Sequence, residues 1–110
     1  MPHPTTFVVV WEFLVRPGSE ARFEKAYGQE GAWVELFRTN PNFIRTELQR
    51  DLSQRNRYWT LDVWTSEAAY NEFRVAHTGD YQRIDSECER LTELERELGR
   101  FTPVLSETEL

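Results

Sequence analysis

Apolar side chains occupy both faces of the first predicted strand. Residues Thr6 to Val15 read T-F-V-V-V-W-E-F-L-V, a β-branched and aromatic run that ends in the turn signal Arg16-Pro17-Gly18. A strand with one solvated face would alternate apolar and polar residues, but here only Glu12 interrupts the apolar pattern. The segment therefore predicts a sheet that is covered on both faces.

The segment after this strand has helical spacing that glycines interrupt. Ser19 can cap a helix whose apolar positions, from Phe23 onwards, lie three or four residues apart, and these positions resume after Gly28 and Gly31. Asn40-Pro41-Asn42 ends the pattern, because proline disfavours helical geometry in the residue before it. We expect one helix that is interrupted or kinked near the glycines.

Two strands and a second helix follow. Phe43 to Arg50 alternates polar and apolar residues, and a polar loop joins it to the aromatic-rich run from Arg57 to Trp64. This arrangement predicts a β-hairpin. Ser66 can then cap a helix that carries aromatic residues on one face, with a break at Thr78-Gly79.

The last third of the chain has a second helical pattern. From Asp80 to Gly99, apolar residues recur three or four positions apart among charged ones: Tyr81, Ile84, Cys88, Leu91, Leu94 and Leu98. We expect this helix to end at Gly99. Phe101 to Leu105 predicts a short last strand, in which Pro103 suits only an edge or a strand end.

The order of strand, helix, strand, strand, helix and strand predicts a ferredoxin-like α+β fold. In it, both helices cover one face of a four-stranded antiparallel sheet and leave the other face bare. We expect a single domain over residues 1–110, with its core at about residues 6–105, and a homodimer that covers the open sheet face. Phe7, Val9, Trp11 and Phe13 then face the helices, whereas Val8, Val10 and Leu14 face the partner.

Charge and composition exclude several function classes. The formal net charge of -6 argues against nucleic acid and anionic membranes, because phosphate binding needs clustered Lys and Arg. The longest apolar run is far shorter than the roughly 20 residues that span a bilayer, and the start of the chain lacks the pattern of a secretion signal, so we expect a cytoplasmic protein. The single Cys88 and the two distant histidines offer no metal-ligand set.

Three local motifs coincide with those of one family. They are the R-P-G turn after the first strand, the N-P-N-F entry to the second strand at residues 40–43, and W-T-S-E-A-A-Y-N-E-F at residues 64–73. Together they resemble the antibiotic biosynthesis monooxygenase (ABM) family of dimeric α+β barrels. The resemblance covers roughly Phe7 to Val104 and implies a ligand pocket in each protomer between the helices and the sheet.

The resemblance implies a cofactor-independent monooxygenase that oxidises a small aromatic or quinol-type substrate with dioxygen. The alternative is a non-catalytic small-molecule-binding barrel. Some ABM relatives bind and degrade haem, but the positions that serve haem in that branch correspond here to Trp11, Phe73 and Arg83, none of which fits its pattern. Haem binding is therefore a minority hypothesis, and we expect no cofactor and no metal.

His77 is the candidate catalytic base. Such an oxygenase must deprotonate a phenol or enol, and a histidine with an ordinary pKa near 6.5 on the same helical face as two aromatic residues fits this task. The alternative is a histidine that only interacts with the last carbonyl groups of its helix.

Large aromatic residues are the candidate substrate-binding groups, since a planar substrate stacks well on them: Trp11, Trp33, Phe37, Trp64, Tyr70 and Phe73. They can equally be core or dimer-interface residues.

Glu12 needs a partner inside its apolar strand, and Arg45, Arg50 or Arg57 on neighbouring strands can supply it. A structural ion pair is the favoured role for Glu12.

Overall fold

Four strands form one antiparallel sheet in the spatial order β2-β3-β1-β4. The computed structural model describes residues 6–104. The strands in chain order are β1 (Phe7–Val15), β2 (Phe43–Arg50), β3 (Arg57–Trp64) and β4 (Thr92–Phe101). The predicted hairpin of β2 and β3 is present, and β1 lies at the centre of the sheet between β3 and β4.

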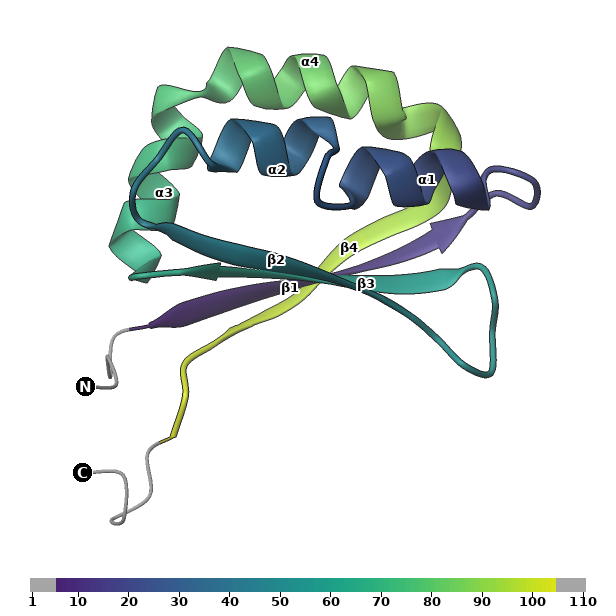
Figure 1. Cartoon of the computed structure of the whole chain (residues 1–110), viewed down its shortest axis with the longest axis horizontal. Helices are drawn as coiled ribbons and strands as arrows, with labels where there is room; N and C mark the ends of the chain where they lie inside the picture. The colour runs from purple at the N-terminus through teal and green to yellow at the C-terminus, as the bar shows by residue number, and fades with distance from the viewer. Residues whose placement is uncertain (1–5, 105–110) are drawn as a thin grey trace.

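The helices all lie on one face of this sheet (Figure 1). They are α1 (Glu20–Tyr27), α2 (Ala32–Phe37), α3 (Glu67–Ala76) and α4 (Thr78–Cys88), followed by a single 3-10 turn, η1 (Glu89–Leu91). The predicted ferredoxin-like α+β fold is confirmed. The second face of the sheet has no helix over it in the described part of the chain.

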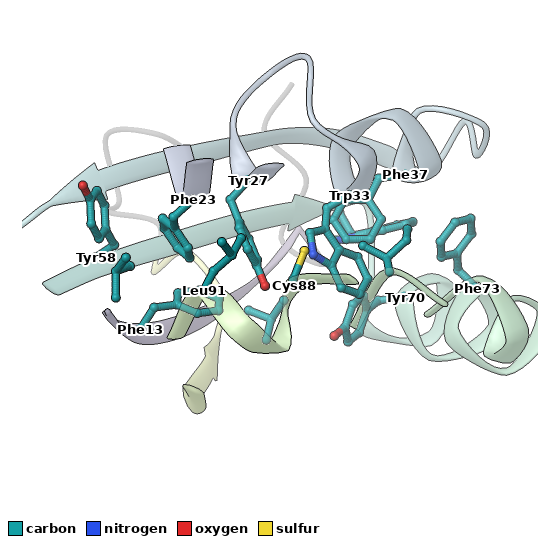
Figure 2. Close-up of a cluster of buried hydrophobic side chains, with 14 of the residues drawn as sticks. Phe13, Phe23, Tyr27, Trp33, Phe37, Tyr58, Tyr70, Phe73, Cys88 and Leu91 are labelled. Atoms are coloured by element: carbon teal, nitrogen blue, oxygen red, sulfur yellow. The ribbon is translucent and has the colours of Figure 1, made fainter. Parts of the chain in front are cut away.

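Alternation along β1 directs its odd-numbered side chains toward the helices. Val9, Phe13 and Val15 are at most 2% exposed and belong to a continuous apolar core. The Phe13 ring lies 5.1 Å from the ring of Phe23 and 4.8 Å from that of Tyr27, both on α1. Figure 2 shows this aromatic layer between sheet and helices. Burial of such rings supplies most of the free energy that holds α1 on the sheet.

The glycine-rich interruption of the first helix is confirmed, and its backbone geometry leaves no room for a side chain at Gly31. α1 ends at Tyr27 and α2 starts at Ala32, and a Cβ atom on Gly31 would collide with the carbonyl oxygen of Ala26. At the helix starts, Ser66 accepts a hydrogen bond from the Ala69 amide at 3.1 Å, whereas the Ser19 side chain makes no capping bond. The predicted cap at Ser19 is therefore wrong.

The predicted helix from Asp80 to Leu98 is wrong in its second half. α4 ends at Cys88, and residues 92–101 form β4, which pairs antiparallel with β1. Leu94 and Leu98 are four residues apart, a spacing that fits a helix but also places two side chains on one face of a strand. Pairing with the central strand therefore overrides the helical preference of this glutamate-rich segment.

Two smaller predictions at the same end also change. β4 ends at Phe101, so the expected strand from Phe101 to Leu105 does not exist as such, and Leu105 lies outside the described residues. The break between the third and fourth helices falls at His77 rather than at Thr78-Gly79, because α4 already starts at Thr78.

An ion-pair network lies at the centre of the outer sheet face. Glu12 is only 4% exposed, and its carboxylate lies 2.6 Å from the guanidinium of Arg57 and 2.6 Å from that of Arg96. Hydrogen bonds from Arg57, and then from Arg96, hold the pKa of Glu12 below its usual value. Of the three expected partners only Arg57 is correct, because Arg45 pairs with Glu47 and Arg50 with Glu24.

Arg96 was not foreseen as a partner because its segment was predicted to be helical. The register of β4 places it directly opposite Glu12.

Over residues 6–104, no helix is both long and apolar enough to cross a membrane.

Candidate functional site

A cavity of about 440 Å³ lies between the helices and the inner face of the sheet. Half of the residues that line it are aromatic and come from β1 and from all four helices: Trp11, Phe13, Tyr27, Trp33, Phe37, Tyr70 and Tyr81. Such a space is large enough for a small ring system and offers flat apolar surfaces for stacking. Figure 2 shows the hydroxyl end of Tyr27 and the indole of Trp33 in the middle of this aromatic layer.

The polar groups of the cavity come from the sheet, from the helices and from the 3-10 turn: Thr46, Thr60, Asp62, Arg74, Asp85, Glu89 and Glu95. Asp62 of β3 is the most buried of the charged groups, with 6% of its surface exposed. Thr46 of β2, its register partner, donates a hydrogen bond of 2.7 Å to one carboxylate oxygen. This hydrogen bond fixes the orientation of the carboxyl group.

Burial raises the pKa of Asp62 to about 6, and the hydrogen bond from Thr46 offsets part of that shift. In the described part of the chain, Asp62 has no ion-pair partner. A carboxylate of this kind is ionised at neutral pH yet accepts a proton more readily than an ordinary one. It has the properties of a general base within an apolar cavity.

Arg74 and Tyr81 add two further polar groups to the cavity wall. The guanidinium of Arg74 lies 5.6 Å above the ring of Tyr70 and 5.5 Å above that of Tyr81, so cation–π contacts hold it in place. The Tyr81 hydroxyl is buried, and no described residue hydrogen-bonds to it. Both groups can therefore interact with a ligand.

Comparison with known proteins identifies the family. The model of the antibiotic biosynthesis monooxygenases matches residues 6–82, which is more than half of the chain. The chain belongs to the antibiotic biosynthesis monooxygenase family. Among curated proteins, no sequence matches it.

Solved structures of similar proteins agree with this ABM fold. SnoaB, a cofactor-independent oxygenase from Streptomyces nogalater, is 24% identical, with a TM-score of 0.74 over 96% of this chain and 99% of its own. A candidate antibiotic biosynthesis monooxygenase from Bordetella bronchiseptica is 22% identical, with a TM-score of 0.76 over 92% and 99%. A protein from Pseudomonas aeruginosa is 16% identical, with a TM-score of 0.69 over 96% and 100%. At these identities the likeness concerns the fold.

Four of the six predicted substrate-binding residues line the cavity of this ABM domain: Trp11, Trp33, Phe37 and Tyr70. The other two, Trp64 and Phe73, pack behind it, with ring centroids 5.1 Å apart. Trp64 is fully buried, and Phe73 is 2% exposed. Contact with a substrate remains a prediction for the first four.

His77, the predicted base, is not among the residues that line the cavity. Its ring lies 4.2 Å from the ring of Phe73, and its Nδ1 atom lies 3.0 Å from a carboxylate oxygen of Asp80. These contacts hold His77 at the junction of α3 and α4. Its catalytic role in this ABM domain remains a prediction, and the cavity itself offers Asp62 for the same task.

Asp62 was not selected from the sequence, although β3 contained a signal for it. In the run R-Y-W-T-L-D-V-W, alternation places Asp62 on the same face as Tyr58, Thr60 and Trp64, all of which face the helices. An acidic residue on the buried face of a strand is unusual enough to mark a candidate site.

Among the described residues no cluster of side chains suits a metal ion.

Proposed function

We propose that this ABM domain is a cofactor-independent monooxygenase that oxidises a small planar phenol or enol with dioxygen. The observation that carries the proposal is Asp62, a buried carboxylate with a raised pKa that opens into an aromatic cavity. Family membership and the fold shared with the Streptomyces nogalater oxygenase support the same class of reaction.

The reaction begins with proton transfer to Asp62. The resulting anion of the substrate passes one electron to dioxygen, and the radical pair then recombines to form a C–O bond at a ring carbon that bears hydrogen. Cleavage of the O–O bond and loss of that hydrogen as a proton leave a carbonyl group, and the second oxygen atom leaves as water. The substrate supplies all four electrons that dioxygen accepts, so the reaction needs no other reductant.

The cavity wall supports these steps in two ways. Stacking between the substrate and rings such as Trp11 and Tyr70 excludes water, which protects the radical pair from side reactions. The guanidinium of Arg74 supplies a positive charge near the anion that forms. Asp62 is preferred to His77 as the base because only Asp62 lines the cavity.

Oxygen consumption by purified protein tests this function. With anthrones, naphthols and hydroquinones as substrates, we expect one molecule of dioxygen to be consumed per molecule of quinone formed, with no hydrogen peroxide released. Isotope-labelled dioxygen should place one labelled atom in the product. Saturable binding without oxygen uptake across this panel would contradict the proposal and favour a non-catalytic binding protein.

We also propose that the open sheet face forms a homodimer. This face carries exposed apolar side chains from β3 and β4, including Trp59, Leu94 and Phe101. Leu61 lies between Glu47 and Val10 on neighbouring strands, at the centre of the face. Association would remove these side chains from water, as in obligate dimers, whose interfaces are as apolar as the core of a single domain.

A glutamate in place of Leu61 should therefore prevent dimerisation, because each protomer would bury a charge without a partner. We expect analytical ultracentrifugation to give a dimer for the wild-type protein and a monomer for Leu61→Glu at micromolar concentration. Val75→Glu is the matched control, since Val75 is 78% exposed on α3, away from the sheet. A monomeric wild-type protein would refute the proposed interface.

A further inference from the structure

The inner face of β3 changes from aromatic to polar in the middle of the strand. The side chains on this face are, in order, those of Tyr58, Thr60, Asp62 and Trp64. The two middle side chains are short, so they leave space above the sheet, whereas the buried rings at either end fill it. Thr60 and Asp62 line the cavity, and Tyr58 and Trp64 do not. The floor of the cavity is therefore polar at these two positions.

The hydroxyl group of Thr60 is buried without a protein partner. Thr60 is only 3% exposed, and no described residue forms a hydrogen bond with its hydroxyl group. The nearby Thr46 differs, because its hydroxyl group donates to Asp62 at 2.7 Å. Buried polar groups are normally hydrogen-bonded. Since Thr60 lines the cavity, a ligand there can supply the missing partner.

The carboxyl group of Asp62 can also accept a further hydrogen bond. Asp62 is 6% exposed, and Thr46 binds one of its two oxygen atoms. Both oxygen atoms of a carboxylate are acceptors, and within residues 6–104 no side chain donates to the second one. The cavity floor thus offers two buried polar groups to a ligand, one at Thr60 and one at Asp62.

The spacing of these two groups limits the ligands that can bind both. Thr60 and Asp62 are two residues apart on one strand, so their Cα atoms are about 7 Å apart and their side chains point the same way. Two oxygen substituents on adjacent ring carbons lie too close together for this spacing, and two on opposite carbons point away from each other. A 1,3 arrangement suits it. Trp11, the register partner of Thr60, also lines the cavity and can stack on the ring.

We propose that the cavity selects aromatic ligands with two oxygen substituents in a 1,3 arrangement, one hydroxyl group bound to Asp62 and the other oxygen bound to the Thr60 hydroxyl. The proposal rests on the proposed function in one respect, because it takes the hydroxyl group at Asp62 as the one that loses its proton. A second oxygen substituent also enriches the ring in electrons, which favours electron transfer to dioxygen. Thr60 is therefore a specificity-determining residue.

Calorimetric titration in the absence of oxygen tests the selection. The probes are 1,3-, 2,3- and 1,4-dihydroxynaphthalene, which differ only in the positions of the hydroxyl groups, and 1-naphthol, which has one hydroxyl group. We expect the 1,3 isomer to bind about tenfold more tightly than each of the others, because only this isomer forms both hydrogen bonds. Equal binding of the three isomers, or no binding of the 1,3 isomer, would overturn the proposal.

Variants of Thr60 locate the second hydrogen bond. Thr60→Val keeps the shape of the side chain but removes the hydroxyl group, so it should weaken binding of the 1,3 isomer about tenfold and leave 1-naphthol unaffected. Thr60→Ser retains the hydroxyl group and should retain the preference. Thr92→Val is the matched control, since Thr92 is buried in β4 and does not line the cavity. A preference for the 1,3 isomer that survives in Thr60→Val would refute the role of Thr60.

Binding and turnover fail independently in these experiments. Selective binding of the 1,3 isomer by a protein that consumes no oxygen with any substrate would refute the oxygenase and leave the ligand class intact. Oxygen uptake with the same KM for all three isomers would refute the ligand class and leave the oxygenase intact.

Discussion

Replacement of Asp62 with asparagine is expected to slow substrate oxidation at neutral pH by about 100-fold or more, because an amide cannot accept the substrate proton. The asparagine carbonyl can still accept the hydrogen bond from Thr46, so the local geometry should persist. Oxygen-electrode rates for the wild-type protein and Asp62→Asn, with circular dichroism to verify folding, measure this effect.

His77→Ala is the comparison that assigns the base. If Asp62 accepts the proton, His77→Ala should retain most of the rate, and the wild-type rate should rise with pH through the pKa of Asp62 near 6. The same rise should be absent from the residual activity of Asp62→Asn. A large loss in His77→Ala with normal activity in Asp62→Asn would transfer the role to His77.

Stability provides an independent readout of the same carboxyl group. Burial raises the pKa of Asp62 from 3.8 to about 6, so between these values the folded state binds more protons than the unfolded state. The contribution of Asp62 to stability is therefore greatest below pH 3.8 and falls as the pH rises toward 6. Urea unfolding should show this decline in the wild-type protein and a smaller one in Asp62→Asn.

Trp64→Ala should destabilise the fold by about 3–5 kcal/mol, a large part of the total stability of a small domain. Trp64 is fully buried, and its ring contacts Phe37 of α2, Tyr70 of α3 and Phe43 of β2. Its truncation would leave a cavity where three elements meet. Urea unfolding at equilibrium measures the change.

Two further variants show what the Trp64→Ala result reports. Trp64→Phe changes the side-chain volume alone, and Leu52→Ala is the control at an exposed site. The indole N–H of Trp64 has no hydrogen-bond partner among the described residues, so Trp64→Phe removes volume without breaking a polar contact and should cost only about 1–2 kcal/mol. Leu52→Ala should have almost no effect, because Leu52 is fully exposed in the loop between β2 and β3. If Trp64→Ala cost no more than Leu52→Ala, the role of Trp64 in the core would be refuted.

Local pattern was sufficient for the first three strands and for the helices up to α3. β1 is apolar on both faces, and proline or glycine follows β1, α1 and α2 within a few residues, so tertiary context adds little there. Residues 92–98 were predicted as helix because glutamate, arginine and leucine favour helices locally. Their strand conformation depends on β1, more than 75 residues earlier in the chain, which no local window contains.

The candidate site was predictable only in part, for a related reason. Aromatic residues such as Trp11 and Tyr70 are conspicuous in sequence, and they do line the cavity. Glu95 could not be assigned to the site while its segment was expected to be a solvated helix face. Asp62 was detectable by strand alternation alone, but its burial depends on the helices packed above it.

The position of β4 beside β1 has a consequence for biosynthesis. The central strand is translated first, yet one of its two neighbours is completed only at residue 101. Until then, β1 presents an unpaired, apolar edge, which is the kind of surface that recruits other nascent chains. Contacts between such distant segments also slow folding. A ribosome-bound chain that stops short of residue 92 should therefore depend on chaperones far more than the complete chain does.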